Sequence, residues 1–326
     1  MAVYTELGAE TLASIIDAFD VGSLVFAKGI AEGVSNSNWL IETTGRTGRG
    51  ARFILTMYER RTEISDLPFF LGLLDHLADR NCPVPRTIHD RDGRAFRFHD
   101  GKALALIEFL PGVSVSAPTA GQARAVGSAL AQMHLAAGDF PASRPNGLGL
   151  AAWRELADAC GDAGLAGIDP VLPGLVGREL DRLEREWPEN LPVSIIHADL
   201  FPDNVLMTGD RVSALIDFYF ACSDITAYDI AVTHAAWCFS GDGRIFDPVL
   251  SRALLEGYEA SRKLSDEERA ALPLLAQGAS MRFLMTRAYD WANTPADAMV
   301  TRKDPMAFAR RLQFYADPAN AAVFAA

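Results

Sequence analysis

Residues 195–220 are the stretch that most restricts what this chain can fold into, because short apolar runs alternate there with polar loops. The apolar runs are too short for ordinary helices and are typical of strands. Three polar residues stand at fixed spacing: Asp199, Asn204 five residues later, and Asp217 thirteen residues after that. Carboxylate and amide oxygens are the ligands that Mg²⁺ prefers in proteins. The segment therefore predicts strands that carry oxygen ligands on their connecting loops.

The spacing His197-x-Asp199-x4-Asn204 matches the catalytic loop of protein kinases. In that loop the aspartate orients the attacking hydroxyl group and the asparagine holds a metal ion, while a second aspartate after the next hairpin takes the magnesium. Asp217 occupies that second position. A loop in which the same side chains only cap turns is the alternative. The strands expected on both sides favour the kinase interpretation.

Length and composition are those of an ordinary globular chain. The 326 residues are 49% hydrophobic and 22% charged, which suggests two domains. The net charge of −12 argues against nucleic acid and anionic membrane as partners, but not against ATP, because a local field can oppose the net charge. No apolar run is long enough to span a membrane. Scattered cysteines and the absence of a signal-peptide pattern predict a cytoplasmic protein.

The first 110 residues are expected to form a small antiparallel sheet. Apolar runs of strand length are bounded by turns, and helices are expected over residues 11–19 and 66–80. The last run, residues 103–110, ends at a Pro-Gly turn. In a two-lobed kinase the chain would pass between lobes here, and adenine would bind backbone groups near Glu108 and Leu110; a plain strand would look the same. We therefore expect two domains, residues 1–110 and 111–326.

The polar segment at residues 29–39 is expected to form the hairpin between the first two strands. Backbone N–H groups and short side chains are suited to cover a triphosphate, although a plain turn rich in Gly, Ser and Asn has the same composition. On the next expected strand, residues 52–58, Thr56 occupies the place where protein kinases have a lysine that pairs the phosphates. The candidate phosphate-binding residues of the hairpin are Ser35, Asn36, Ser37 and Asn38.

Residues 111–326 are expected to be mainly helical. His134 lies on the apolar face of an expected helix at residues 119–137, which predicts a packed, hydrogen-bonded core histidine. Asp229 enters an apolar helix, where a carboxylate needs a structural partner, so we expect it to support the loop at residues 197–204. The other helices are expected at residues 151–163, 171–187, 247–261, 265–275, 277–292 and 305–314.

The loop at residues 197–205 resembles that of the aminoglycoside-phosphotransferase-like superfamily of small-molecule kinases. More narrowly, the chain is similar to the homoserine kinases of that superfamily, and the string Asp-Phe-Tyr-Phe-Ala-Cys at residues 217–222 is what narrows the resemblance. The resemblance extends over residues 4–315. The other segments that carry it are residues 35–39, 54–59, 66–72, 228–231, 236–239, 287–291 and 303–305.

This resemblance implies an α+β, two-lobed protein-kinase-like fold with a small antiparallel-sheet N-lobe and a larger, mainly helical C-lobe. It implies ATP-dependent phosphorylation of the side-chain hydroxyl of L-homoserine, a step toward threonine. Asp199 would orient the hydroxyl, while Asn204 and Asp217 would hold Mg²⁺. A zwitterionic amino acid also needs one anionic and one cationic partner. The candidates for these two roles are Asp224, Arg282 and Arg287.

The chain departs from the pattern of its relatives at three places. Ala198 stands where many relatives have glycine, and Tyr219 follows Phe218 where the kinase pattern has glycine. The strand lysine is absent. Arg60, Lys28 or the hairpin amides are the possible substitutes at the phosphates, and the sequence does not choose among them.

Two other functions stay open. A kinase of the same fold for another hydroxyl substrate, such as an aminoglycoside, choline or a sugar, would share the same reacting residues. A non-catalytic, nucleotide-binding kinase-like protein is favoured by the missing lysine and opposed by the intact Asp199, Asn204 and Asp217. The sequence does not indicate the oligomeric state.

Overall fold

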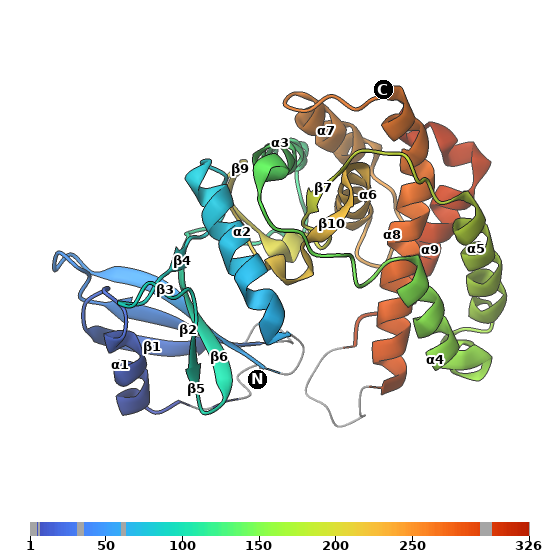
Figure 1. Cartoon of the computed structure of the whole chain (residues 1–326). Helices are drawn as coiled ribbons and strands as arrows, with labels where there is room; N and C mark the ends of the chain where they lie inside the picture. The colour runs from blue at the N-terminus through green and yellow to red at the C-terminus, as the bar shows by residue number, and fades with distance from the viewer. Residues whose placement is uncertain (1–4, 6, 31–35, 60–62, 294–301, 326) are drawn as a thin grey trace. The chain divides into compact units, whose positions relative to one another are not determined.

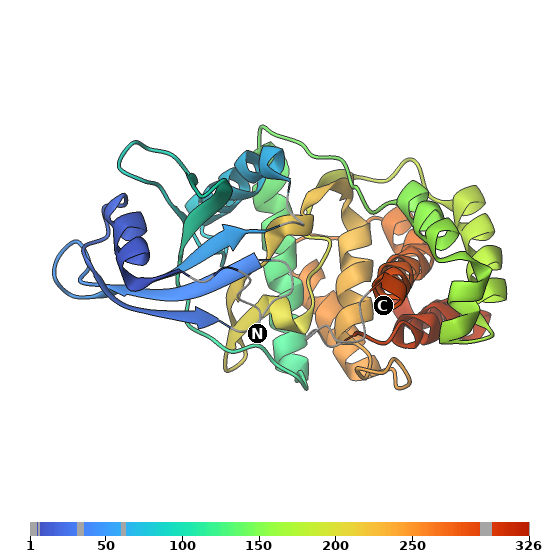
Figure 2. The same cartoon turned by 90° about the horizontal axis from the view of Figure 1, so that it is seen from below.

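The computed structural model of the chain describes residues 5, 7–30, 36–59, 63–293 and 302–325. The chain divides into two compact units, residues 1–112 and 113–326. Their helices and strands are drawn in Figure 1 and, from a second direction, in Figure 2. Within the described ranges, no helix combines the length and the apolar character needed to cross a lipid bilayer.

The N-terminal unit is built on a six-stranded sheet in which every paired strand is antiparallel, as the sequence predicts. The strand order is β1-β2-β3-β6-β4, and β5 also pairs with β6. This sheet places the end of β3 beside the start of β6, because Met57 is opposite Leu104. The strands are β1 (Leu24–Ile30), β2 (Asn36–Thr43), β3 (Ala51–Tyr58), β4 (Thr87–Ile88), β5 (Arg97–His99) and β6 (Lys102–Glu108).

Two helices accompany this sheet. The first, α1 (Ala9–Asp17), buries Ile16 against a cluster that includes Trp39, Leu55 and Leu106 from three different strands. Successive strand residues point to opposite faces of a sheet, so these side chains define one apolar face. The second helix, α2 (Leu67–Asp79), lies along β4, where Thr87 Oγ1 donates a hydrogen bond to the Leu71 carbonyl oxygen at 3.1 Å.

The expected polar hairpin at residues 29–39 is partly wrong. Strand β1 continues to Ile30 and strand β2 already begins at Asn36, so Asn36, Ser37 and Asn38 are strand residues rather than turn residues. Their register with β3 explains this, since Asn38 is opposite Thr56 and their side chains join in a hydrogen bond of 2.8 Å. Ser35 lies outside the described residues, as does Arg60.

The C-terminal unit is mainly helical, as predicted. Its long helix α8 (Asp266–Asn293) contacts α4, α6 and α9, and the two figures show α8 and α9 side by side. The sequence predicted two helices in place of α8. The structure has one helix that runs through Pro273 and Gly278 near the predicted break, because packing of this buried stretch outweighs their low helix propensity. The other helices are α3 (Ala120–Ala136), α4 (Leu150–Ile168), α5 (Leu172–Glu186), α6 (Thr226–Trp237), α7 (Pro248–Glu259) and α9 (Met306–Ala316).

Two short antiparallel ladders carry the loops of the C-terminal unit. In one ladder β7 (Val193–Ile196) pairs with β10 (Cys222–Ile225), and in the other β8 (Val205–Thr208) pairs with β9 (Arg211–Leu215). Residues 197–204 connect β7 to β8, and residues 216–221 connect β9 to β10. The ladders therefore hold both polar loops of the sequence pattern at their ends.

Candidate active site

Asp199 and Asn204 are brought together by a tight turn in the loop that follows β7. A 3-10 turn at Pro202–Asn204 reverses the chain before β8. The side-chain amide nitrogen of Asn204 then donates to the Asp199 carbonyl oxygen at 2.8 Å and to Asp199 Oδ2 at 3.1 Å. The five-residue spacing thus places the amide of Asn204 directly on the carboxylate of Asp199.

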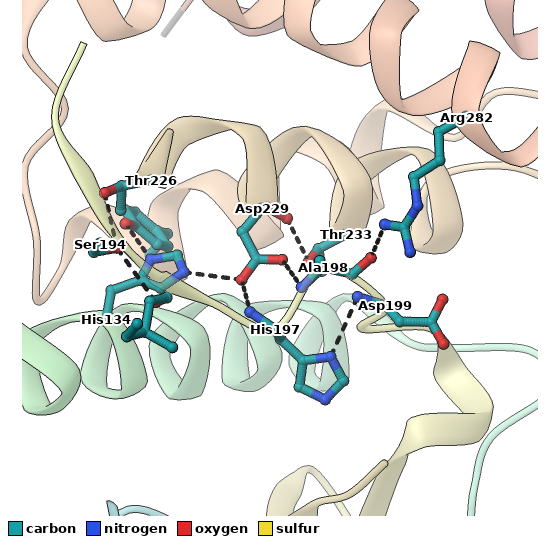
Figure 3. Close-up of polar contacts among 11 residues, drawn as sticks. His134, Ser194, His197, Ala198, Asp199, Thr226, Asp229, Thr233 and Arg282 are labelled. Atoms are coloured by element: carbon teal, nitrogen blue, oxygen red, sulfur yellow. Dashed lines mark hydrogen bonds and ion pairs between the residues drawn. The ribbon is translucent and has the colours of Figure 1, made fainter. Parts of the chain in front are cut away.

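Asp229 fixes the backbone at the start of this loop. Its two carboxylate oxygens accept the amide hydrogens of His197 at 2.7 Å and of Ala198 at 2.8 Å. Figure 3 shows both bonds, and it shows the Asp199 carboxylate pointing away from Asp229. Ala198 has a φ of 62°, a left-handed conformation that costs a non-glycine residue about 1 kcal/mol. The prediction that Asp229 supports the loop is confirmed.

His134, on α3, holds the same carboxylate from the other side. Its Nε2 atom lies 3.0 Å from Asp229 Oδ2, and its Nδ1 atom lies 2.8 Å from the Tyr258 hydroxyl group. Burial alone would raise the pKa of Asp229, but the hydrogen bonds from His134 and the loop amides hold that pKa below its usual value. Asp229 is therefore an ionised, buried anchor, and His134 is the hydrogen-bonded core histidine that the sequence predicted.

His197 braces the loop from within. Its Nε2 atom lies 3.0 Å from the Ile216 carbonyl oxygen, and its Nδ1 atom accepts the Asp199 amide hydrogen at 3.3 Å. These partners assign the tautomer with hydrogen on Nε2. Burial lowers the pKa of His197, so the ring is neutral. The histidine ties the Asp199 loop to the strand end that precedes Asp217.

Arg282, one of the predicted substrate residues, lies beneath the loop. Its side chain is 2% exposed and donates a hydrogen bond to the Ala198 carbonyl oxygen. The guanidinium group also lies over the Phe220 ring at 5.3 Å and over the Phe283 ring at 4.6 Å. Arg282 therefore holds Ala198 by its carbonyl oxygen, while Asp229 holds the same residue by its amide.

Two carboxylates sit in surroundings that disfavour their charge: Asp199, the candidate catalytic residue, and Asp217, a candidate metal ligand. Burial raises the pKa of Asp199 to about 7; the nearby Arg282 opposes this rise and the Asp217 charge adds to it. Burial and the Asp203 charge raise the pKa of Asp217 to about 6, although water still reaches this side chain. Perturbed carboxylates that gather on one loop system are typical of functional sites.

The β8–β9 hairpin brings Asn204 and Asp217 to the same end. Asn204 precedes β8 and Asp217 follows β9, and the Ile216 amide donates to the Asn204 carbonyl oxygen at 3.0 Å. Asp217 adopts a left-handed conformation with a φ of 65°. Over the described residues, no group of three or more His, Cys, Asp or Glu side chains is arranged to hold a metal ion. A metal ion here would take its remaining ligands from a bound phosphate and water.

The other two predicted substrate residues also lie in the C-terminal unit. Asp224, on β10, accepts a hydrogen bond from the Asn146 side chain at 2.6 Å. Arg287, on α8, lies over the Phe308 ring at 4.5 Å and donates to the Asp304 carbonyl oxygen at 3.2 Å. Burial lowers the pKa of Arg287 to about 10, while the charges of Asp304 and Asp199 oppose this fall. Arg287 is therefore close enough to Asp199 to feel its charge.

The predicted nucleotide residues lie on the sheet of the N-terminal unit. Glu108 ends β6, and its amide donates to the Arg86 carbonyl oxygen at 2.9 Å; Leu110 follows two residues later. Asn36 Oδ1 accepts from the Glu59 amide at 3.4 Å. Ser37 is fully buried and donates to Glu59 Oε1 at 2.8 Å. Nothing in these contacts assigns a ligand to them.

The sequence did not reveal an ion pair beside Ser37, in which the carboxylate is buried and the lysine is exposed. Lys102 Nζ lies 2.6 Å from Glu59 Oε2, and Lys102 also donates to the Thr5 hydroxyl group at 2.6 Å. Ser37 is opposite Met57 in the register, whereas Asn38 is opposite Thr56. Because side chains alternate between faces, this ion pair and Thr56 are on opposite faces of the sheet.

A phosphotransferase is the class of protein that this fold and this loop define. A profile described as the phosphotransferase enzyme family matches residues 27–264. The structure is similar to a solved amicoumacin kinase, with a TM-score of 0.71 and 14% identity over 95% of this chain and 93% of the other. That likeness confirms the predicted protein-kinase-like fold.

Sequence relatives narrow the class. The chain is 50% identical to a homoserine kinase of Gluconobacter oxydans, over 97% of this chain and 98% of the relative. It is 49% identical to a homoserine kinase of Nitrobacter hamburgensis, over 98% and 96% of the two chains. The chain belongs to the homoserine kinase family of phosphotransferases.

Proposed function

We propose that the protein transfers the γ-phosphoryl group of ATP to the side-chain hydroxyl group of L-homoserine, forming O-phospho-L-homoserine and ADP. The observation that carries this proposal is the end-to-end similarity to homoserine kinases, at 50% identity over 97% of the chain. The arrangement around Asp199 supports it, because Asp229 holds the backbone of the loop and Asn204 holds the Asp199 carboxylate. Phosphoryl transfer depends on such positioning more than on covalent catalysis.

Asp199 is the proposed catalytic residue. Its carboxylate accepts a hydrogen bond from the homoserine hydroxyl group and orients the oxygen toward the γ-phosphorus atom. The new oxygen–phosphorus bond forms as the bond to the bridging oxygen of ADP breaks, and Asp199 takes the hydroxyl proton late in the step. Asn204 keeps the carboxylate in place, since its amide nitrogen is bonded to Asp199 Oδ2 at 3.1 Å.

Asn204 and Asp217 fit the needs of a Mg²⁺ ion. The amide nitrogen of Asn204 is committed to Asp199, so its side-chain oxygen is the atom that can serve as a ligand. Burial raises the pKa of Asp217 to about 6, and a bound cation would favour its ionised form. Mg²⁺ uses one or two carboxylates together with phosphates and water. When bound, it would neutralise charge on the phosphates.

The amino-acid end of the substrate needs a cation for its carboxylate and an anion for its ammonium group. Arg287 is our choice for the carboxylate, because it is half-buried and senses the charge of Asp199. Asp224 is our choice for the ammonium group, because it is the acidic member of the three candidates; it lies on β10 opposite Ser194. Arg282, the third candidate, is buried beneath the loop, so we assign it no direct contact with the substrate.

The nucleotide residues and the cellular compartment are parts of the same proposal. Glu108 and Leu110 would bind adenine through their backbone groups, and Ser35, Asn36 and Asn38 would lie near the phosphates. Ser37, whose hydroxyl group is bonded to Glu59 on the opposite face, would only support the strand between them. All four cysteines are present as thiols, which fits a reducing, cytoplasmic compartment.

The test is ADP release with Mg-ATP and a panel of L-homoserine, choline, kanamycin and a hexose. We expect rapid turnover with homoserine alone. The Asp199→Asn variant should lose at least about a hundredfold in kcat, the usual effect of removing a general base. Turnover with another member of the panel would keep the phosphotransferase mechanism and replace the substrate. Nucleotide binding without turnover on any of them would contradict the proposed activity.

A further inference from the structure

Lys303 stands over the middle of the Asp199 loop, although it lies about a hundred residues further along the chain. Its Nζ atom is 3.7 Å from Asp203 Oδ2 and 5.8 Å from the centre of the Phe201 ring. Phe201 and Asp203 both belong to the loop between Asp199 and Asn204. The lysine side chain is 64% exposed. A solvent-accessible cation from the segment before α9 is therefore held beside the loop that carries Asp199 and Asn204.

The aromatic part of this contact is fixed by the helices behind it. The Phe201 ring lies 4.8 Å from the Phe283 ring of α8 and 6.0 Å from the Phe308 ring of α9. A lysine that rests on a fixed ring retains its position better than one that extends freely into solvent. The Asp203 partner is 63% exposed, and exposed ion pairs of this kind are weak. A stronger anion can therefore replace Asp203 on Lys303.

The charge of Lys303 reaches both Asp199, the candidate catalytic residue, and Asp217, the candidate metal ligand. It acts to lower the pKa of Asp199 and the pKa of Asp217 against the larger effect of burial. Two other described cations lie near this loop. Arg282 is buried and bonded to a backbone carbonyl oxygen. Arg287, which we assign to the substrate carboxylate, lies over the Phe308 ring and donates to the Asp304 carbonyl oxygen. Lys303 is thus an exposed cation that faces the place where a phosphoryl group would meet Asp199 and Asp217.

Phosphoryl transfer needs such a cation, and the N-terminal sheet does not supply it at the usual strand position. Thr56 stands where protein kinases carry their lysine, and Lys102 is paired with Glu59 on the opposite face of the sheet. Charge on the transferred group is stabilised by cations placed against its oxygens.

We propose that Lys303 binds the terminal phosphate of the bound nucleoside triphosphate and stabilises its charge during transfer. The inference rests on the proposed function, because it assumes a nucleotide at Asn204 and Asp217. It assigns a residue of the C-terminal segment to the task left open by the missing strand lysine. The carboxylate of the amino-acid substrate is the other anion that Lys303 could meet, and the experiment separates the two.

The experiment compares binding of Mg-AMP-PNP and Mg-ADP by titration calorimetry, with no acceptor present. We expect Lys303→Met to weaken AMP-PNP binding about tenfold or more, as loss of one charge-assisted hydrogen bond predicts. ADP binding should change less than about twofold, because ADP lacks the terminal phosphate. Lys303→Arg should retain most of the AMP-PNP affinity. Lys263→Met is the matched control, since it removes another exposed lysine of the same unit.

Equal effects on AMP-PNP and ADP, or no effect on either, would overturn the inference. Unchanged nucleotide binding together with a raised KM for homoserine would overturn it as well and would assign Lys303 to the substrate carboxylate. Failure of the wild-type chain to bind either nucleotide would instead overturn the proposed function itself. The wild-type titration therefore distinguishes the two failures, whatever the true acceptor is.

Discussion

The carboxylate of Asp229 accepts the amide hydrogen of Ala198 at 2.8 Å and thereby stabilises a left-handed backbone one residue before Asp199. The same carboxylate accepts the His197 amide at 2.7 Å, so one buried anion determines the direction in which the chain leaves β7. A short loop without such an anchor would sample several conformations. Part of the site's geometry therefore comes from a helix that contributes no side chain to the reaction.

The first prediction concerns this anchor. Asp229→Asn replaces one acceptor oxygen by a donor that faces the amides of His197 and Ala198. We expect a loss of about 2–4 kcal/mol in unfolding free energy, measured by urea denaturation, because buried donors lose their partner. Steady-state kinetics should show a lower kcat with a nearly constant KM for ATP, since Asp199 moves and the nucleotide ligands do not.

A matched control comes from Asp247, which caps α7 by accepting the amides of Val249 at 2.8 Å and Leu250 at 3.1 Å. Asp247→Asn should cost about 1 kcal/mol or less in unfolding free energy and leave kcat unchanged. An equal fall in kcat for both variants would mean that general destabilisation, rather than loop positioning, explains the result for Asp229.

The second prediction concerns Ala198 itself. Its φ of 62° is costly for alanine and free for glycine. Glycine also widens the conformations open to the unfolded chain, so Ala198→Gly should change the unfolding free energy by less than about 1 kcal/mol. Ala198→Val should cost more than that, because a β-branched residue fits this conformation poorly. Thermal unfolding of wild type and the two variants measures their order of stability. A valine variant as stable as wild type would contradict the prediction.

Spacing within the sequence was sufficient to predict that the candidate reacting residues lie close together. His197, Asp199 and Asn204 lie within eight positions, and one hairpin links them to Asp217, so local geometry brings them together. The antiparallel sheet and the helical unit could also be predicted, because apolar periodicity is a local property of the sequence. The hairpin at residues 29–39 was predicted less well, because asparagine and serine are turn formers and only cross-strand pairing shows that Asn38 belongs to β2.

Contacts between distant parts of the chain could not be predicted from the sequence. His134 and Asp229 are 95 residues apart, and Lys102 and Glu59 are 43 apart. A lone histidine in an apolar helix predicts some buried partner without naming it. Lys303 carries even less signal, since a lysine in a polar segment is normally a solvated surface residue. Such residues are found only when the packing of α8, α9 and the loop is known.

The third prediction concerns pH. The pKa of Asp199 is raised to about 7 in the fold, whereas an unperturbed aspartate titrates near 4. Between these values the folded chain binds more protons than the unfolded chain, so this group lowers the unfolding free energy as pH rises through about 4 to 7. Asp199→Asn removes the effect. The variant should therefore gain stability relative to wild type on going from pH 5 to pH 8.

Urea denaturation of metal-free protein at the two pH values measures this difference. Asp158→Asn, which removes an exposed carboxylate from α4, is the control and should track wild type at both. If Asp199→Asn also tracks wild type, the carboxylate is not held in surroundings that disfavour its charge.

The last prediction concerns the ion pair of the N-terminal sheet. Glu59 accepts hydrogen bonds from Lys102, Ser37 and Thr5, and although burial acts to raise its pKa, these bonds hold that pKa below its usual value. Lys102→Met leaves this mostly buried carboxylate without its cation, so we expect a loss of about 1–3 kcal/mol in unfolding free energy. Arg52→Met, which breaks an exposed pair with Glu42, should cost less than about 1 kcal/mol. Because Lys102 lies on the face opposite Thr56, the affinity for ADP should remain that of wild type. A selective loss of nucleotide affinity in Lys102→Met would instead assign Lys102 to the phosphates.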